Sequence, residues 1–249
     1  NDAGTVVLVG APADAGSVLA YAKQANGSWT LTDVLRPRHP GLVPACAQPG
    51  ASVAMDANAT VAFVSCLPPD VGGSVSSTSV VVAVFARNAS SSMLGDGSGA
   101  WTEVEPVVLV VSDTPFDVAS PHVSVSASGS TLAVSQPFAP SGGGVAVFNR
   151  TLDGSATGGF RYARRTPPGG LVTGSGGAWY QGTSLAMAGN GGTITWGSKY
   201  ANGNHGASWV FARNAASAAG WSQQGGVMYE PPLHRLREYE NEAQWWSIG

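Results

Sequence analysis

Hydrophobic and polar residues alternate along most of this chain, and one alternating pattern occurs four times. It reads VLAYAKQ at 18–24, VAVFARN at 82–88, VAVFNR at 145–150 and SWVFARN at 208–214. The aromatic residue of each copy stands at position 21, 85, 148 or 211, so successive copies are 64, 63 and 63 residues apart. Alternation with a period of two predicts β-strands. The constant spacing indicates an internal structural repeat.

Each repeat predicts the same succession of short strands, four in the second to fourth repeats and three in the first. The predicted strands cover 5–10, 18–23 and 29–35; 52–55, 60–66, 79–86 and 101–111; 122–126, 131–137, 144–149 and 160–165; and 184–188, 193–198, 207–212 and 221–229. Stretches rich in glycine and proline separate the strands, as loops require. The repeats therefore cover approximately 1–51, 52–121, 122–183 and 184–249.

The strand pattern predicts an all-β chain, because helical periodicity is nearly absent. A four-stranded antiparallel unit cannot bury both of its faces alone and must stack on its neighbours. Radial stacking of such units produces a β-propeller. We therefore expect one β-propeller over 1–249, or a fragment of one, with four-stranded antiparallel blades. The first repeat lacks an innermost strand, which favours a larger propeller or array and a part in a larger assembly.

The composition excludes several classes of protein. Charged residues make up 11% of the chain and the net charge is −3, so neither nucleic acid nor anionic lipid is an expected partner. No apolar run approaches the 18 residues or so that a transmembrane helix needs. Cys46 and Cys66 are the only cysteines. A disulfide between them suits an extracellular or cell-surface protein, and two unrelated buried thiols are the alternative.

Several strand pairs carry a family resemblance. The segments SVAMDANATVAFVS at 52–65, HVSVSASGSTLAVSQP at 122–137 and SLAMAGNGGTITWGS at 184–198, with TVVLVGAP at 5–12, resemble the FG-GAP-like repeats of integrin-α-type propellers. The resemblance implies adhesion and, in many members, a calcium loop between the first two strands. Here the corresponding turns at 1–4, 56–59, 127–130 and 189–192 contain only two carboxylates. Calcium needs six or more oxygen ligands, so we expect no metal and no cofactor.

Four N-x-[ST] sequences mark candidate glycosylation sites, at Asn26, Asn58, Asn88 and Asn149. Asn26, Asn88 and Asn149 fall at nearly the same point of the repeat, just past the third strand. The alternative is that asparagine simply favours turns. The sequons predict a secreted glycoprotein with N-linked glycans on one edge.

No catalytic motif is recognisable in the sequence. The four histidines are not at metal-ligand spacing, and no nucleophile elbow or phosphate-binding loop is present. The sequence therefore predicts a non-catalytic extracellular adhesion or structural module that contacts a protein or glycan through loops on one face. The candidate contact residues in those loops are Trp179, Tyr180, Lys199, Tyr200 and His205.

A carbohydrate-active propeller, either a lectin or a glycosidase, is the alternative function. It would need aromatic platforms and, for hydrolysis, two carboxylates within about 5 to 10 Å of each other. The acidic residues in the expected face loops are Asp70, Asp113 and Asp117.

Overall fold

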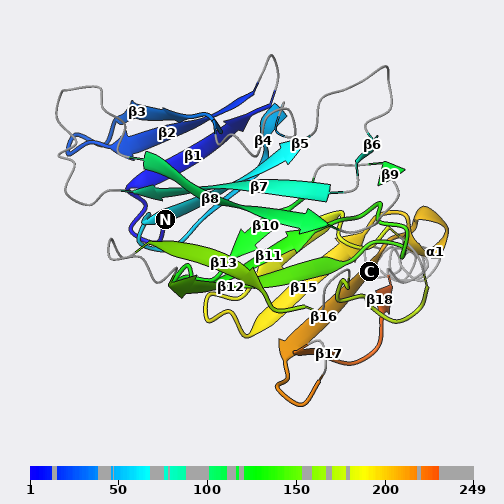
Figure 1. The fold of residues 1–249 in the computed structure, drawn as a ribbon. Coiled ribbons are helices and arrows are strands. Elements are labelled where there is room, and N and C mark those ends of the chain that lie inside the picture. The colour runs from blue at the N-terminus through cyan, green and yellow to red at the C-terminus, as the bar shows by residue number, and fades with distance from the viewer. Residues whose placement is uncertain are drawn as a thin grey trace, which may run out of the picture.

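The computed structural model describes most of the chain, and its described part is built almost entirely of strands (Figure 1). The described residues are 1–12, 16–38, 46, 48–67, 76–77, 79–87, 101–110, 116–117, 121–152, 159–166, 170–177, 180–217 and 220–229. The one helix among them is α1 (Ala201–Asn204). The prediction of an all-β chain is confirmed.

The strands form four main antiparallel sheets that follow one another along the chain. The first sheet contains β1 (Val6–Ala11), β2 (Ser17–Lys23) and β3 (Trp29–Leu35). The second contains β4 (Gln48–Met55), β5 (Val61–Leu67), β7 (Ser79–Arg87) and β8 (Trp101–Val110). The third contains β10 (Val123–Val125), β11 (Thr131–Ser135), β12 (Val145–Leu152) and β13 (Phe160–Arg164).

The fourth sheet contains β14 (Ser184–Met187), β15 (Thr193–Ser198), β16 (Ala207–Arg213), β17 (Trp221–Gln223) and β18 (Met228–Tyr229). Both β17 and β18 pair with β16, so the single fourth strand predicted at 221–229 is in fact two short strands. Gly225, with a φ of +71°, turns the chain between them. A separate small sheet pairs β6 (Ser76–Ser77) with β9 (Phe116–Asp117).

The turns between the first two strands of each repeat are linked from sheet to sheet. The backbone N–H of Asp2 donates to the carbonyl of Ala57, and that of Ala57 donates to the carbonyl of Ala127, at 3.1 and 2.9 Å. The N–H of Ala127 then donates to the carbonyl of Gly189 at 2.8 Å. These equivalent hydrogen bonds align the four repeats with one another at one end of the sheets.

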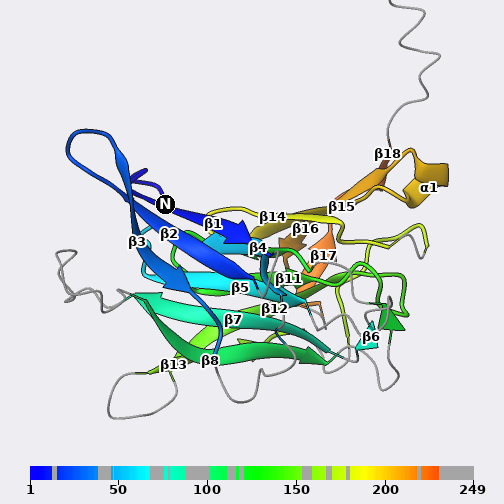
Figure 2. The same cartoon turned by 90° about the horizontal axis from the view of Figure 1, so that it is seen from above.

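Neighbouring sheets pack hydrophobic side chains against each other, and the second and third sheets bury both of their faces. Between the second and third sheets the rings of Phe63 and Tyr162 meet edge to face, 5.1 Å apart. In the junction of the third and fourth sheets the rings of Trp196 and Phe211 stack at 4.3 Å. Figure 2 shows the sheets following one another in this order. The hydrophobic cores therefore lie between sheets.

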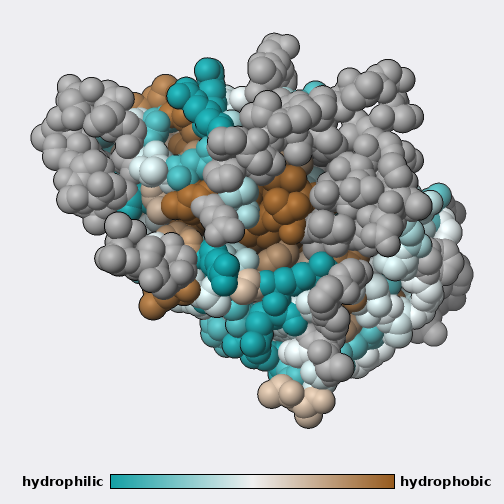
Figure 3. Space-filling view, in the orientation of Figure 1, coloured by the Kyte–Doolittle hydropathy of each residue, from teal (hydrophilic) through white to brown (hydrophobic). Residues whose placement is uncertain are grey.

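Side chains that lie outside these junctions reach the surface. Figure 3 shows a hydrophobic area over β7 and β8 beside hydrophilic side chains over β13. Val108 of β8 is 49% exposed.

Candidate functional site

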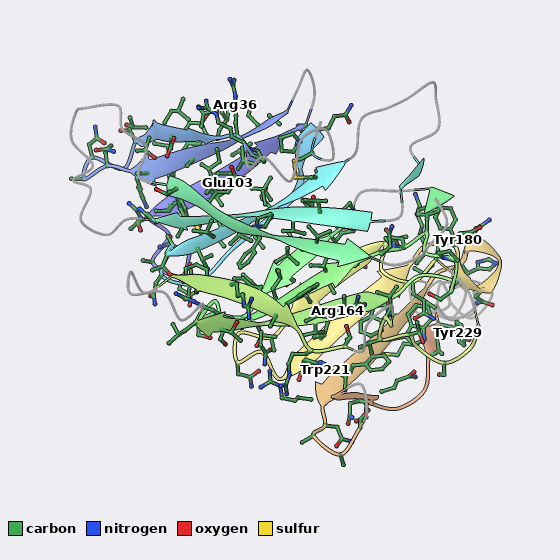
Figure 4. All side chains as sticks on the ribbon, viewed as in Figure 1. Arg36, Glu103, Arg164, Tyr180, Trp221 and Tyr229 are labelled. Atoms are coloured by element: carbon green, nitrogen blue, oxygen red, sulfur yellow. A yellow bond between two sulfur atoms is a disulfide. The ribbon has the colours of Figure 1, made fainter. Side chains whose placement is uncertain are left out.

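Three aromatic side chains form a cluster at the end of the third and fourth sheets that carries α1. The ring centre of Phe138 lies 4.9 Å from that of Tyr180 and 6.1 Å from that of Tyr200. The two tyrosine rings are 5.4 Å apart. Tyr180 is 45% exposed and Tyr200 36%, so this aromatic cluster offers ring surface to solvent. Figure 4 shows Tyr180 beside α1.

The backbone around the aromatic cluster is held in left-handed conformations. The φ angles are +53° at Tyr180, +52° at Asn202 and +71° at Asn204. Asparagine tolerates this region, but a bulky residue such as tyrosine pays about 1 kcal/mol or more for it. Among the described residues other than glycine, only Ala59 shares a positive φ. Conformations of this kind gather at functional sites, which marks this end of the sheets for closer attention.

The buried amide of Gln181 fixes the segment that carries Tyr180. Its Oε1 accepts hydrogen bonds from the backbone N–H of Gly174 at 2.5 Å and from the indole N–H of Trp196 at 3.2 Å. Its Nε2 donates to the carbonyls of Gly174 and Gly177 at 3.0 and 3.2 Å. Because Gln181 is only 2% exposed, these bonds form away from competing water, and they set the position of the neighbouring tyrosine.

A pocket of about 410 Å³ opens beside the aromatic cluster. We call it the loop pocket; its lining residues are Thr183, Ser184, Gly197, Ser198, Lys199, His205, Gly206, Ala207, Ser208 and Met228. Lys199 connects the pocket to the cluster, because its Nζ lies 4.9 Å from the ring centre of Tyr200. Such a distance allows a cation–π interaction. Hydroxyl groups, one ammonium group and one imidazole therefore face a common space.

A second histidine supports the wall of the loop pocket. Burial lowers the pKa of His122, and a hydrogen bond with the backbone of Thr183 opposes that shift. The hydroxyl of Thr183 in turn accepts a hydrogen bond from the backbone N–H of Lys199 at 3.2 Å. The half-buried His122 thus helps to position two residues of the pocket from behind.

The structure brings together most of the contact residues expected from the sequence. Tyr180 and Tyr200 lie in the aromatic cluster, while Lys199 and His205 line the loop pocket. Trp179 lies outside the described residues. The sequence did not single out Phe138 or Met228. Both lie in or next to glycine- and proline-rich segments, where no periodic pattern shows which side chains meet.

The candidate glycosylation sites have different surroundings. Asn26 lies in the exposed turn after β2, where its Oδ1 accepts hydrogen bonds from the backbone N–H and hydroxyl of Ser28 at 3.0 and 2.7 Å. Asn58 is exposed in the turn before β5, and Asn88 lies outside the described residues. Asn149 was expected just past a strand, but β12 continues to Leu152. Its Oδ1 is buried without a hydrogen-bond partner.

Cys46 and Cys66 are joined by a disulfide, with Cα atoms 4.7 Å apart.

The structure does not describe the side chains of the carboxylates considered for hydrolysis. Asp70 and Asp113 lie outside the described residues, and only the backbone of Asp117 is described, in β9. Across the described part of the chain, no three His, Cys, Asp or Glu side chains are placed to share a metal ion. No helix described there is long and apolar enough to span a membrane.

Comparison with known proteins gives similarity in structure but not in sequence. No family model matches the chain, and no curated protein matches it. One similar structure, described as a 6-phosphogluconolactonase from Bacteroides uniformis, has a TM-score of 0.41 and 13% identity, covering 91% of this chain and 68% of the other. Another is the periplasmic gluconolactonase of Pseudomonas aeruginosa, with a TM-score of 0.38 and 16% identity, covering 90% of this chain and 66% of the other.

These findings correct the functional prediction made from sequence. The similar structures are described as lactonases rather than integrin-type propellers, so the assignment to FG-GAP-like repeats is wrong. The prediction of a non-catalytic adhesion or structural module is therefore also wrong, as is the prediction that the protein is not an enzyme. The physical reason is that short alternating strands and Gly-Ala-Pro turns report β-sheet geometry, which unrelated proteins share, whereas function depends on the site.

Proposed function

We propose that the loop pocket binds a sugar-derived lactone and hydrolyses its ring ester. His205 is the general base, Lys199 stabilises the charge that develops on the carbonyl oxygen, and the hydroxyl groups of the pocket bind those of the sugar. The observation that carries the proposal is the presence of Lys199 and His205 in one hydroxyl-rich pocket of about 410 Å³ beside exposed tyrosine rings.

The proposed reaction needs only these two charged or titratable groups. His205 accepts a proton from a water molecule while the water oxygen forms a bond to the carbonyl carbon. The negative charge on the carbonyl oxygen is stabilised by the ammonium group of Lys199. When this intermediate collapses, the ring C–O bond breaks and the leaving alkoxide takes the proton from the imidazolium of His205. The product is the open hydroxy acid.

The lining of the loop pocket favours an ester over a glycoside as substrate. Glycoside hydrolysis generally uses two carboxylic acids on opposite sides of the bond, and no carboxylate is among the described residues that line this pocket. Hydrolysis of a lactone requires activation of water and stabilisation of an oxyanion. An imidazole and an ammonium group can supply both.

We also propose that the four sheets are successive blades of a β-propeller. The linked turns support this, since each repeat makes the same contact with the next. The exposed face of the first sheet supports it as well: Val7 and Val9 are 40% and 44% exposed, whereas their equivalents in β5, Ala62 and Val64, are buried against the first sheet. Another blade on that face would complete the pattern.

The disulfide and the sequons support a location outside the reducing cytosol. Disulfides persist in oxidising compartments, and N-glycans are added to secreted chains. We therefore propose that the protein acts in an extracellular or similar compartment, with a small polyhydroxylated molecule as its ligand at the loop face.

The test is hydrolysis of glucono-1,5-lactone, a substrate suggested by the names of the similar structures, measured above the spontaneous rate. His205→Ala should lower kcat by roughly 100-fold or more, and Lys199→Ala should also lower it. The chain's other lysine gives a matched control: Lys23 ends β2 in the first sheet, and Lys23→Ala should leave the rate unchanged. Absence of hydrolysis by the wild-type protein, or full activity of His205→Ala, would overturn the proposal.

A further inference from the structure

A second cavity, of about 230 Å³, lies between the third and fourth sheets at the end opposite α1. We call it the arginine cavity; its lining includes Val147, Asn149, Arg165, Arg213 and Trp221. Figure 4 shows Trp221 far from Tyr180. The cavity is therefore separate from the loop pocket.

The arginine cavity is positively charged although the chain as a whole carries a net charge of −3. Arg165 and Arg213 both line it, and no carboxylate is among its described lining residues. Arg213 is oriented by a hydrogen bond from Nη2 to the hydroxyl of Thr131 at 3.4 Å, and its guanidinium carbon lies 5.9 Å from the ring centre of Trp221. Two guanidinium groups facing one space favour an anion.

Asn149 supplies a hydrogen-bond acceptor with no partner inside the protein. Its Oδ1 is buried and unpaired, and its backbone is fixed in the middle of the sheet, opposite Thr131 on one side and Ala163 on the other. An acceptor that is buried without a hydrogen bond destabilises the protein. A ligand with a hydroxyl group would satisfy it.

Comparison of the repeats shows that Asn149 is particular to the third sheet. In the second sheet, the paired residues Val61 and Ala86 stand where the third sheet has Thr131 and Asn149. The same strand position is alanine in the other two sheets as well, at Ala22 opposite Val6 and at Ala212 opposite Thr193.

Arg165 is likewise polar where the second sheet is apolar. Its backbone N–H donates to the carbonyl of Val147 at 2.8 Å, and the corresponding residue in the second sheet is Val104, paired with Val84. Val104 packs in the hydrophobic core between the second and third sheets. Three apolar positions of one junction are thus polar in the next. Packing alone does not explain this change, because apolar residues at the equivalent positions already fill the junction between the second and third sheets.

We propose that the arginine cavity binds a small hydroxylated oxyanion. Arg165 and Arg213 hold the carboxylate or phosphate group, a hydroxyl of the ligand donates to Oδ1 of Asn149, and Trp221 forms one wall. The volume suits a molecule of a few carbon atoms. The site does not depend on the hydrolytic activity proposed for the loop pocket.

The experiment is titration calorimetry on protein from a bacterial host without N-glycosylation. Malate and succinate differ by a single hydroxyl, so their comparison measures the contribution of Asn149. Glycerol 3-phosphate tests a phosphate group in place of a carboxylate. We expect malate or glycerol 3-phosphate to bind, and malate to bind at least 5-fold more tightly than succinate.

Two variants copy residues that already occur at the equivalent positions of other sheets, and so preserve the fold. Asn149→Ala should abolish the preference for malate over succinate. Arg165→Val should weaken binding of both at least 10-fold, whereas Arg161→Gln, an exposed position on β13, should leave binding unchanged. The proposal is overturned if neither malate nor glycerol 3-phosphate binds at 10 mM, if Arg165→Val binds like the wild type, or if malate has no advantage over succinate.

Discussion

The hydroxyl of Tyr162, in β13, donates a hydrogen bond to the carbonyl oxygen of Gly129 across 2.5 Å. Gly129 lies in the turn between β10 and β11, beside Asp56 and Val61 of the second sheet. The same tyrosine ring packs edge-on against Phe63 of that sheet. One side chain thus ties the outer strand of the third sheet, its first turn and the neighbouring sheet together. Burial raises the pKa of Tyr162 far above its ordinary value, so the hydroxyl keeps the proton that it donates.

Replacing Tyr162 by phenylalanine removes the donor but keeps the ring. The carbonyl of Gly129 then remains buried without a partner, which costs about 1 to 3 kcal/mol. The free energy of unfolding in urea should fall by that amount. Tyr21→Phe, at a partly exposed position for which no side-chain hydrogen bond is seen, should change it by less than about 0.5 kcal/mol. Equal stability of the two variants would contradict the role assigned to Tyr162.

Gly129 itself should tolerate no side chain. Its φ is +68°, and an added Cβ would stand 2.9 Å from Cγ1 of Val61, so Gly129→Ala combines backbone strain with a clash. We expect a loss of about 2 kcal/mol or more in unfolding free energy. Gly4 is the matched control, because it occupies the equivalent turn with a φ of +59° and no atom within 4 Å of its Cβ position. Gly4→Ala should cost only the strain, about 1 kcal/mol. A loss no larger at Gly129 than at Gly4 would show that the contact with Val61 is unimportant.

The strands could be predicted from the sequence because alternation acts over short distances. The repeated aromatics Phe85, Phe148 and Phe211 lie in the third strand of their sheets and are buried in the junctions between sheets, while Tyr21 lies in the second of the three strands of the first sheet. Alternation also places Asn149 on the same face as Val147. Aligned by this register, the third repeat has an asparagine where the other repeats have alanine. The sequon that begins at Asn149 suggested a turn instead.

The candidate site could be predicted only in part, because loop geometry has no period. Tyr180, Lys199 and Tyr200 were identified as exposed aromatic and basic residues in loops. The contact of the two tyrosines with Phe138 depends on the left-handed backbone at Tyr180 and on the buried amide of Gln181. Neither feature leaves a pattern in the sequence.

Loss of the Cys46–Cys66 disulfide should destabilise the fold. The bond closes a loop with a sequence separation of 20 residues, for which the chain-entropy model gives about 3 kcal/mol. Cys46→Ala/Cys66→Ala should therefore lose about 3 kcal/mol of unfolding free energy. Reduction of the wild-type protein should produce the same loss, and should have no effect on the double variant. A reductant effect on the variant would mean that the stability change has another source.

Stability should fall in mildly acidic solution because of His122. Burial lowers its pKa in the folded state, while in the unfolded chain it has the ordinary value of about 6.5. Below about pH 6.5 the unfolded chain therefore binds more protons, and unfolding becomes more favourable as the pH falls. The unfolding free energy should be lower at pH 5.5 than at pH 7.5, and His122→Gln should reduce that difference. His205→Gln is the comparison, since its imidazole lies at the surface, and it should keep the acid sensitivity. An unchanged pH dependence in His122→Gln would rule out this explanation.

Glycosylation should distinguish the sequons by their surroundings. Asn26 lies in an exposed turn, so we predict sugar there when the protein is made in a eukaryotic secretory host. A glycan on Asn149 would have to occupy the arginine cavity, because the side chain of Asn149 lines it; a sugar and a bound oxyanion are therefore mutually exclusive at this position. Peptide mapping before and after peptide N-glycosidase treatment measures both sites. An unmodified Asn26 would contradict the first expectation. Full occupancy of Asn149 by a glycan, together with undiminished malate binding by the glycosylated protein, would contradict this mutual exclusion.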